Sequence, residues 1–139
     1  MNKTTFLIVD DDSTSLLLMS TIIMDESNDF EVLQAFNIDD AMMIAKKHLP
    51  QIIITDWRMP NGDGIELIQR LKHDNNTINI PVIIVTALML KSDDKFNVFE
   101  KGASDFIRKP LDSFEFTARI NAILNTNKFN NQYKKRLLT

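Results

Sequence analysis

The chain has 139 residues, and 44% of them are hydrophobic, which is enough for one folded domain with its own core. The absence of cysteine excludes disulfides, thiolate nucleophiles and cysteine-ligated zinc sites. The formal net charge is −3, and acidic residues end at Glu115 whereas basic residues continue behind it, so the body of the domain is not expected to bind nucleic acid directly.

Short apolar runs alternate with longer segments of helical periodicity, which is typical of βαβ units in a parallel sheet that helices cover on both faces. The first, third and fourth runs are almost continuously apolar, so we expect central strands there and an edge strand at the more polar second run. The sequence thus predicts the α/β class, with a doubly wound, five-stranded parallel sheet and strands at residues 5–9, 31–35, 52–55, 82–86 and 105–108.

Five helices are predicted between and after these strands. The first, at 13–27, starts with Ser-Thr-Ser as candidate caps, and we expect it to be heavily buried through Leu16, Leu17, Met19, Ile22, Ile23 and Met24. The second is capped by Asn37 or Asp39 and stops at Pro50, with an inward face of Ala41, Met42, Ile44, Ala45 and Leu49. The others are expected at 63–73, at 93–101 before Gly102, and from Asp112 or Ser113 onward through Phe116, Ile120, Ile123 and Leu124.

The N-terminal segment does not resemble a targeting signal. A single lysine precedes a short apolar stretch that ends in three aspartates. No apolar run reaches the roughly 18 residues that a membrane-spanning helix needs. We therefore expect a soluble, cytoplasmic protein without a membrane partner.

Strong polar residues follow four of the predicted strands at their carboxyl ends, where open parallel sheets bind their ligands. They are Asp10, Asp11 and Asp12 after the first strand, Asp56 after the third, Thr86 at the end of the fourth, and Lys109 before Pro110 after the fifth. A single aspartate at such a position more often caps the next helix, and we expect this role for Asp12. Agreement at four strand ends instead indicates a shared site.

Converging carboxylates repel one another, so such a cluster needs a compensating cation. Oxygen ligands without His or Cys favour Mg²⁺. An EF-hand calcium site is disfavoured, because neither 10–12 nor 61–64 has the alternating acidic spacing and distal Glu of such a loop. A divalent ion, a carboxylate, a hydroxyl and a lysine together suit phosphoryl transfer onto the carboxylate.

Four segments closely resemble the response-regulator receiver domain of bacterial two-component signalling: FLIVDDDS at 6–13, TDWRMPNGDG at 55–64, TA at 86–87 and KP at 109–110. The resemblance covers residues 3–125, and residues 126–139 form a basic tail or the start of a linker helix. It implies a flavodoxin-like sheet of strand order 2-1-3-4-5 and a cis peptide bond before Pro110.

Carried over residue by residue, the resemblance makes Asp56 the phosphoacceptor. It implies Mg²⁺ bound by Asp11 directly, by Asp10 largely through water, by Asp56 and by the backbone carbonyl of Arg58. Thr86 and Lys109 match the hydroxyl and the lysine that contact the phosphoryl group. Phe106 lies at the aromatic switch position, although a plain packing role is an equal alternative. Arg58 and Leu88 are expected to flank the site and slow hydrolysis, and Trp57 is expected to lie partly exposed beside the metal.

The predicted function is a phosphorylation-activated switch that takes a phosphoryl group from a phosphohistidine on a sensor histidine kinase or phosphotransfer protein. The face of the fourth helix, fifth strand and fifth helix would then meet a partner or a second copy. The only chemistry expected is its own phosphorylation and dephosphorylation. The alternative is a phosphorylation-independent binding module that retains the site. A metal-dependent phosphatase is disfavoured, because such enzymes carry a second Asp two residues after the nucleophile, where this chain has Arg58.

Overall fold

The structure, a computed structural model, describes residues 3–88 and 91–138, with side chains as far as residue 127. Five parallel strands form the main sheet in the order β2-β1-β3-β6-β7, which confirms the predicted order once a separate hairpin is numbered in. These strands are β1 (Thr4–Val9), β2 (Phe30–Ala35), β3 (Ile52–Asp56), β6 (Val82–Thr86) and β7 (Asp105–Arg108). The hairpin, which was not predicted, pairs β4 (Arg58–Met59) with β5 (Gly62–Asp63).

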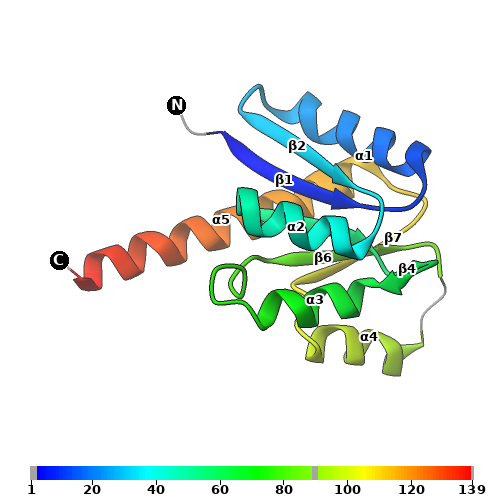
Figure 1. Cartoon of the computed structure of the whole chain (residues 1–139). Helices are drawn as coiled ribbons and strands as arrows, with labels where there is room; N and C mark the ends of the chain where they lie inside the picture. Colours follow the sequence, from blue (N-terminus) through cyan, green and yellow to red (C-terminus); the bar gives the residue numbers. More distant parts are fainter. Residues whose placement is uncertain (1–2, 89–90, 139) are drawn as a thin grey trace.

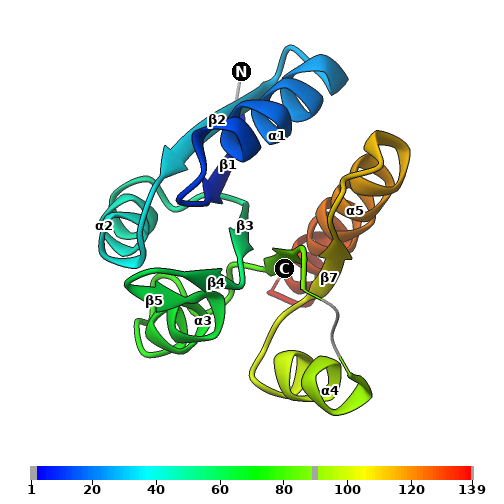
Figure 2. The ribbon, with the colours of Figure 1, turned by 90° about the vertical axis from the view of Figure 1, so that its right-hand side faces the viewer.

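Helices cover both faces of the sheet, as expected for a doubly wound fold (Figures 1 and 2). On one face lie α1 (Ser13–Glu26) and α5 (Ser113–Leu138), and on the other lie α2 (Ile38–His48), α3 (Gly64–Lys72) and α4 (Ser92–Glu100). Among the described residues, no helix is both long enough and apolar enough to cross a membrane.

Two hydrophobic clusters, one on each face, follow from the alternation of side chains along the strands. In β1, Phe6 and Ile8 pack toward α1 and α5, whereas Leu7 and Val9 pack toward α2 and α3, and all four are fully buried. Each such side chain contributes about 1.5–3 kcal/mol through burial. Because both faces of the central strands are covered by apolar side chains, their charged residues lie at the strand ends.

Polar side chains fix the starts of three helices. Asp12 caps α1 by accepting a hydrogen bond from the Thr14 amide, as predicted for Asp12 and in place of the Ser-Thr-Ser candidates. Asn37 caps α2, and Asp63 caps α3 by accepting from the Glu66 amide. These caps set where each helix leaves the carboxyl end of its strand.

Two of the predicted helix faces are wrong in part. Leu17 and Met24 of α1 are 66% and 51% exposed, because only the stripe of Leu16, Met19, Ser20 and Ile23 faces the sheet. Leu49 does not belong to the inward face of α2. It follows the helix in the left-handed conformation, with φ of 48°, and is 48% exposed.

Helix α5 is continuous across the predicted domain boundary at residue 125 and ends at Leu138 (Figure 1). Its first turns pack on the sheet through Phe116 and Ile120, which are buried. The boundary between a receiver domain at 3–125 and a tail or linker helix at 126–139 stays a prediction.

Candidate functional site

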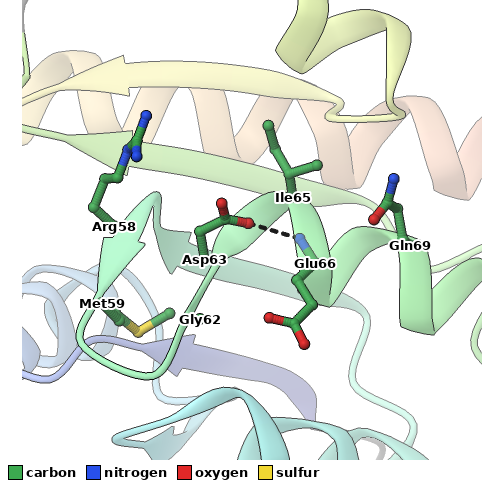
Figure 3. Close-up of a pocket in the computed structure, with 7 residues that line it drawn as sticks. All are labelled: Arg58, Met59, Gly62, Asp63, Ile65, Glu66 and Gln69. Carbon is green, nitrogen blue, oxygen red and sulfur yellow. Dashed lines mark hydrogen bonds between the residues drawn. The ribbon is translucent and has the colours of Figure 1, made fainter.

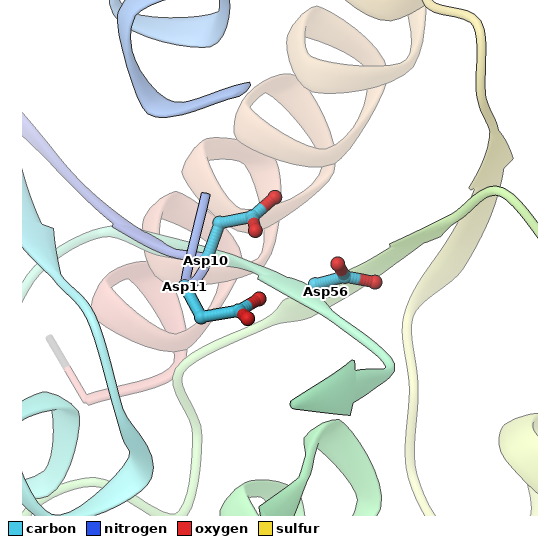
Figure 4. Close-up of side chains that lie close together, drawn as sticks. All are labelled: Asp10, Asp11 and Asp56. Atoms are coloured by element: carbon cyan, nitrogen blue, oxygen red, sulfur yellow. The ribbon is translucent and has the colours of Figure 1, made fainter. Parts of the chain in front are cut away.

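Three carboxylates meet at the carboxyl ends of β1 and β3 (Figure 4). The two strands are neighbours, with Val9 paired to Thr55, so the residues that follow them, Asp10 and Asp56, emerge side by side. Oxygen atoms of Asp10, Asp11 and Asp56 lie within 4.8 Å of one another. Asp10 is buried, Asp56 is half-buried and Asp11 is exposed, so the cluster opens to solvent on the Asp11 side.

Lys109 extends from the end of β7 into this cluster. Its Nζ lies 2.9 Å from Asp10 Oδ2 and 3.5 Å from Asp56 Oδ2. Its backbone amide donates to the Thr86 carbonyl at 2.8 Å, which ties the loop after β7 to the end of β6. The peptide bond between Lys109 and Pro110 is cis, as predicted.

Burial and charge perturb two groups in the cluster. Burial raises the pKa of Asp56, repulsion from Asp10 raises it further, and the attraction of Lys109 offsets only part of this. Burial alone would lower the pKa of Lys109, but its hydrogen bond and ion pair with Asp10, and then Asp56, outweigh that effect and raise it. Lys109 is therefore held as an ammonium ion, and an ionised Asp56 is destabilised.

The donor set fits a hard divalent cation. Three carboxylates and one ammonium leave two negative charges, which one divalent ion would balance. All the candidate side-chain ligands are oxygen atoms, as Mg²⁺ prefers, and the exposed position of Asp11 leaves room for the waters that Mg²⁺ retains. The Arg58 carbonyl as a further ligand stays a prediction.

Thr86 ends β6, directly beside β3, and is 1% exposed. Its Oγ1 accepts a hydrogen bond from the Leu88 amide at 3.2 Å. The structure thus places Thr86 and Lys109 on the same side of Asp56, at the ends of neighbouring strands. Phe106, on β7, is half-buried and packs against the cluster of α2, α3 and α4.

The hairpin β4–β5 closes the site on the side of α3. A Cβ atom on Gly64 would lie 2.7 Å from Ile84 Cδ1 and 2.9 Å from the Asp56 carbonyl oxygen, so only glycine fits there. Gly62 has φ of +147°, which also favours glycine. Gly64 thus allows the chain to pass directly beside Asp56.

Trp57 is not partly exposed beside the metal, as the sequence suggested, but only 6% exposed. Side chains alternate along the strand, so Trp57 shares the α2 and α3 face with Ile53, whereas Asp56 points into the crevice. The guanidinium carbon of Arg58 lies 5.0 Å from the centroid of the Trp57 ring. The exposed side chain of Arg58 is thereby held over the buried Trp57 ring.

A cavity of about 410 Å³ lies between this hairpin and the first turns of α3 (Figure 3). Its lining is mostly polar and was not anticipated from the sequence: Arg58, Met59, Gly62, Asp63, Ile65, Glu66 and Gln69. The sequence analysis also missed a role for Ser15, whose Oγ lies 3.4 Å from Lys109 Nζ. In the sequence it was only one of three candidate caps, and no local signal marks a contact between residues so far apart.

The model of the response regulator receiver domain matches residues 6–121 of the chain. The chain belongs to this family. All the positions that carry the receiver site, from Asp10 to Lys109, lie inside the matched segment. The family assignment and the flavodoxin-like fold that the sequence predicted are therefore confirmed.

Two bacterial regulatory proteins are similar to this receiver domain in sequence. The phosphate regulon transcriptional regulatory protein PhoB of Pseudomonas aeruginosa is 38% identical over 120 residues, which are 86% of this chain and 51% of that protein. The response regulator PleD of Caulobacter vibrioides is 36% identical over 117 residues, 84% of this chain and 25% of PleD. The chain thus spans about half the length of the first relative and a quarter of the second.

The receiver domain of the Francisella response regulator 1452 has a similar structure, with a TM-score of 0.80 and 29% identity. The match covers 90% of this chain and 99% of that one. Receiver domains are signalling switches rather than enzymes that turn over a separate substrate.

Proposed function

We propose that this receiver domain is a phosphorylation-activated switch that accepts a phosphoryl group from a phosphohistidine onto Asp56 in a Mg²⁺-dependent reaction. The observation that carries the proposal is the meeting of Asp10, Asp11 and Asp56 within 4.8 Å, with Lys109 Nζ 3.5 Å from Asp56. A half-buried ammonium beside a half-buried carboxylate is what an acceptor for a phosphoryl dianion requires.

In the proposed reaction, a carboxylate oxygen of Asp56 attacks the phosphorus of the donor. The new O–P bond forms as the P–N bond to the donor imidazole breaks, and that nitrogen keeps the electron pair. Mg²⁺ held by Asp10, Asp11, Asp56 and the Arg58 carbonyl would neutralise charge on the phosphoryl oxygens. Lys109 donates to one phosphoryl oxygen, and the Thr86 hydroxyl turns from Leu88 to donate to another.

The displacement of Thr86 and Lys109 would carry the signal to the face formed by α4, β7 and α5. Two exposed aromatic side chains of α4, Phe96 and Phe99, are 67% and 46% exposed and supply apolar contact area there. Phe106 belongs to β7 in that face, and β7 pairs directly with β6, which ends at Thr86. We propose that this face meets a partner protein or a second copy of the chain in the phosphorylated state.

The remaining partners follow from the same proposal. The phosphodonor is a sensor histidine kinase or a phosphotransfer protein, and the reaction takes place in the cytoplasm. The domain itself catalyses only its own phosphorylation and dephosphorylation, and it does not contact nucleic acid. The alternative is a binding module that works without phosphorylation and retains the site, and it predicts no uptake of phosphoryl groups.

The test is incubation of the chain with acetyl phosphate, with Mg²⁺ or with EDTA, followed by intact-mass spectrometry. We expect the mass of one phosphoryl group to be added only with Mg²⁺ and only while Asp56 is present. Asp56→Asn should gain nothing, whereas Asp112→Asn should behave as wild type, because asparagine can still cap α5 there. Equal uptake by Asp56→Asn would refute the assignment, and no uptake by the wild type would favour the binding module.

A further inference from the structure

Three oxygen atoms surround the ammonium group of Lys109, and one of them belongs to a residue that the resemblance to the family did not assign. Besides Asp10 Oδ2 at 2.9 Å and Asp56 Oδ2 at 3.5 Å, Ser15 Oγ lies 3.4 Å from Lys109 Nζ. Ser15 is half-buried in the first turn of α1. An ammonium group has three protons, so these three oxygens can accept all of them.

The hydroxyl proton of Ser15 has its own acceptor, which orients the oxygen. Ser15 Oγ donates to Asp12 Oδ2 at 3.2 Å, so its lone pairs are left to accept from Lys109. Asp12 is fixed in turn, because its backbone amide donates to Asp10 Oδ1 at 3.0 Å and its carboxylate caps α1 at the Thr14 amide. A hydrogen-bonded chain therefore runs from Asp12 through Ser15 to Lys109, anchored in the first turn of α1.

We propose that Ser15 is a positioning residue that orients Lys109 for phosphoryl transfer to Asp56. The proposal rests on the proposed function of the site. A lysine side chain is long and flexible, so one contact with Asp10 does not fix the direction of its three N–H bonds. The additional contact with Ser15 fixes that direction. The third N–H group of Lys109 makes its longest contact, 3.5 Å, with Asp56. When a phosphoryl group arrives, this N–H group donates its hydrogen bond to a phosphoryl oxygen instead.

Ser15→Thr and Ser15→Val form a matched pair, because both add a β-branched side chain and differ only in a hydroxyl against a methyl group. The measurement is the initial rate of Asp56 phosphorylation in the full chain at rising acetyl phosphate concentrations with Mg²⁺. We expect Ser15→Thr to stay near wild type and Ser15→Val to be slower by about fivefold at saturating donor, the effect of one long hydrogen bond to a charged group. The donor concentration at half-maximal rate should not change. Thr14 precedes Ser15 and is exposed, so Thr14→Val, which also replaces a hydroxyl by a methyl group, should have no effect.

Equal rates in Ser15→Thr and Ser15→Val would overturn the proposal, since the hydroxyl would then be irrelevant. A change confined to the half-maximal donor concentration would also overturn it, because it would indicate altered donor binding.

A second measurement is independent of phosphorylation. The free energy of unfolding in urea is compared for Ser15→Ala, Lys109→Met and the double variant, each checked for its fold by circular dichroism. We expect the loss from Ser15→Ala to be smaller in the Lys109→Met background, because the contact with Lys109 is then already gone and only the hydrogen bond from Ser15 to Asp12 is left to lose. Additive losses would refute the role of Ser15. A wild-type chain that takes up no phosphoryl group would refute the proposed function, and the two failures are thus distinguishable.

Discussion

Lys109 is bound more closely to Asp10 than to the acceptor: its Nζ lies 2.9 Å from the buried carboxylate of Asp10, which is 1% exposed. This pairing neutralises Asp10 in the interior, where an uncompensated charge would be costly. It also leaves Asp56 with only a 3.5 Å contact to the same ammonium group. The half-buried acceptor carboxylate is therefore less compensated than Asp10, and a prediction about its stability cost follows.

Asp56→Asn should stabilise the protein at neutral pH. Because the folded state raises the pKa of Asp56, an ionised Asp56 costs stability above that raised pKa, and the cost disappears as the pH falls toward the ordinary value of about 3.9. We expect a gain of about 1 kcal/mol in the free energy of unfolding at pH 7 without divalent ions, shrinking toward zero near pH 4. Urea unfolding measured across this pH range is the test, with Asp112→Asn as the control. A gain that stayed constant down to pH 4 would contradict the electrostatic cause.

Mg²⁺ should bind weakly and depend on Asp11. The three carboxylates leave several coordination positions to water, so affinity in the millimolar range is expected. Asp11→Asn should weaken binding at least tenfold, because it removes the exposed charged ligand. Trp57 faces away from the crevice, so a titration of backbone amide NMR shifts around residues 10–12 is a more direct readout than its fluorescence. An Asp11→Asn variant that bound Mg²⁺ as tightly as Asp112→Asn would exclude Asp11 from the ligand set.

The strands and the receiver site could be predicted because their signals are local. Each buried strand is a short apolar run, and the first strong polar residue after it marks the edge of the sheet where ligands bind. Asp56 and Lys109 are far apart in the chain, but both follow parallel strands, whose carboxyl ends lie at the same edge of the sheet. The identity of each role came from the resemblance to the receiver family, not from spacing.

What could not be predicted depends on which side of an element meets solvent. Helical periodicity placed Leu17 and Met24 inward, but the sheet covers a narrower stripe of α1 than the apolar residues span. The exposure of Trp57 was predicted wrongly because Trp57 follows Asp56 in the sequence, which suggested that both lie in the same environment. Successive residues along a strand face opposite sides of the sheet. The contact of Ser15 with Lys109 depends on a side-chain rotamer and a tertiary approach, which no local pattern encodes.

Gly64→Ala should destabilise the protein and disturb the site. The new Cβ would lie 2.7 Å from Ile84 Cδ1 and 2.9 Å from the Asp56 carbonyl oxygen, so the backbone at the acceptor must move. We expect a loss of about 2 kcal/mol in the free energy of unfolding, together with slower phosphorylation of Asp56. Urea unfolding and the acetyl phosphate assay measure the two effects. Gln69→Ala, at an exposed position of the same helix, should change neither. A Gly64→Ala variant as stable as Gln69→Ala would show that the site tolerates a side chain there.

We predict that the phosphorylated protein loses its phosphoryl group slowly, on the expectation from the receiver family that Arg58 and Leu88 crowd the approach of the attacking water. Arg58 follows the acceptor by two residues, and the 5.0 Å distance from its guanidinium carbon to the Trp57 ring centroid restrains its long side chain. The backbone amide of Leu88 donates to Thr86 Oγ1 at 3.2 Å, so Leu88 lies just after the end of β6, and its branched side chain is 44% exposed. Replacing both by Arg58→Asn and Leu88→Glu removes this bulk and supplies polar groups that can orient water, so we expect the phosphoryl group to be lost severalfold faster than in wild type.

The measurement is the decay of the phosphorylated mass after acetyl phosphate is removed, with Leu17→Glu on α1 as the control for an exposed leucine. Equal decay rates in the double variant and the control would show that these two side chains do not limit the access of water.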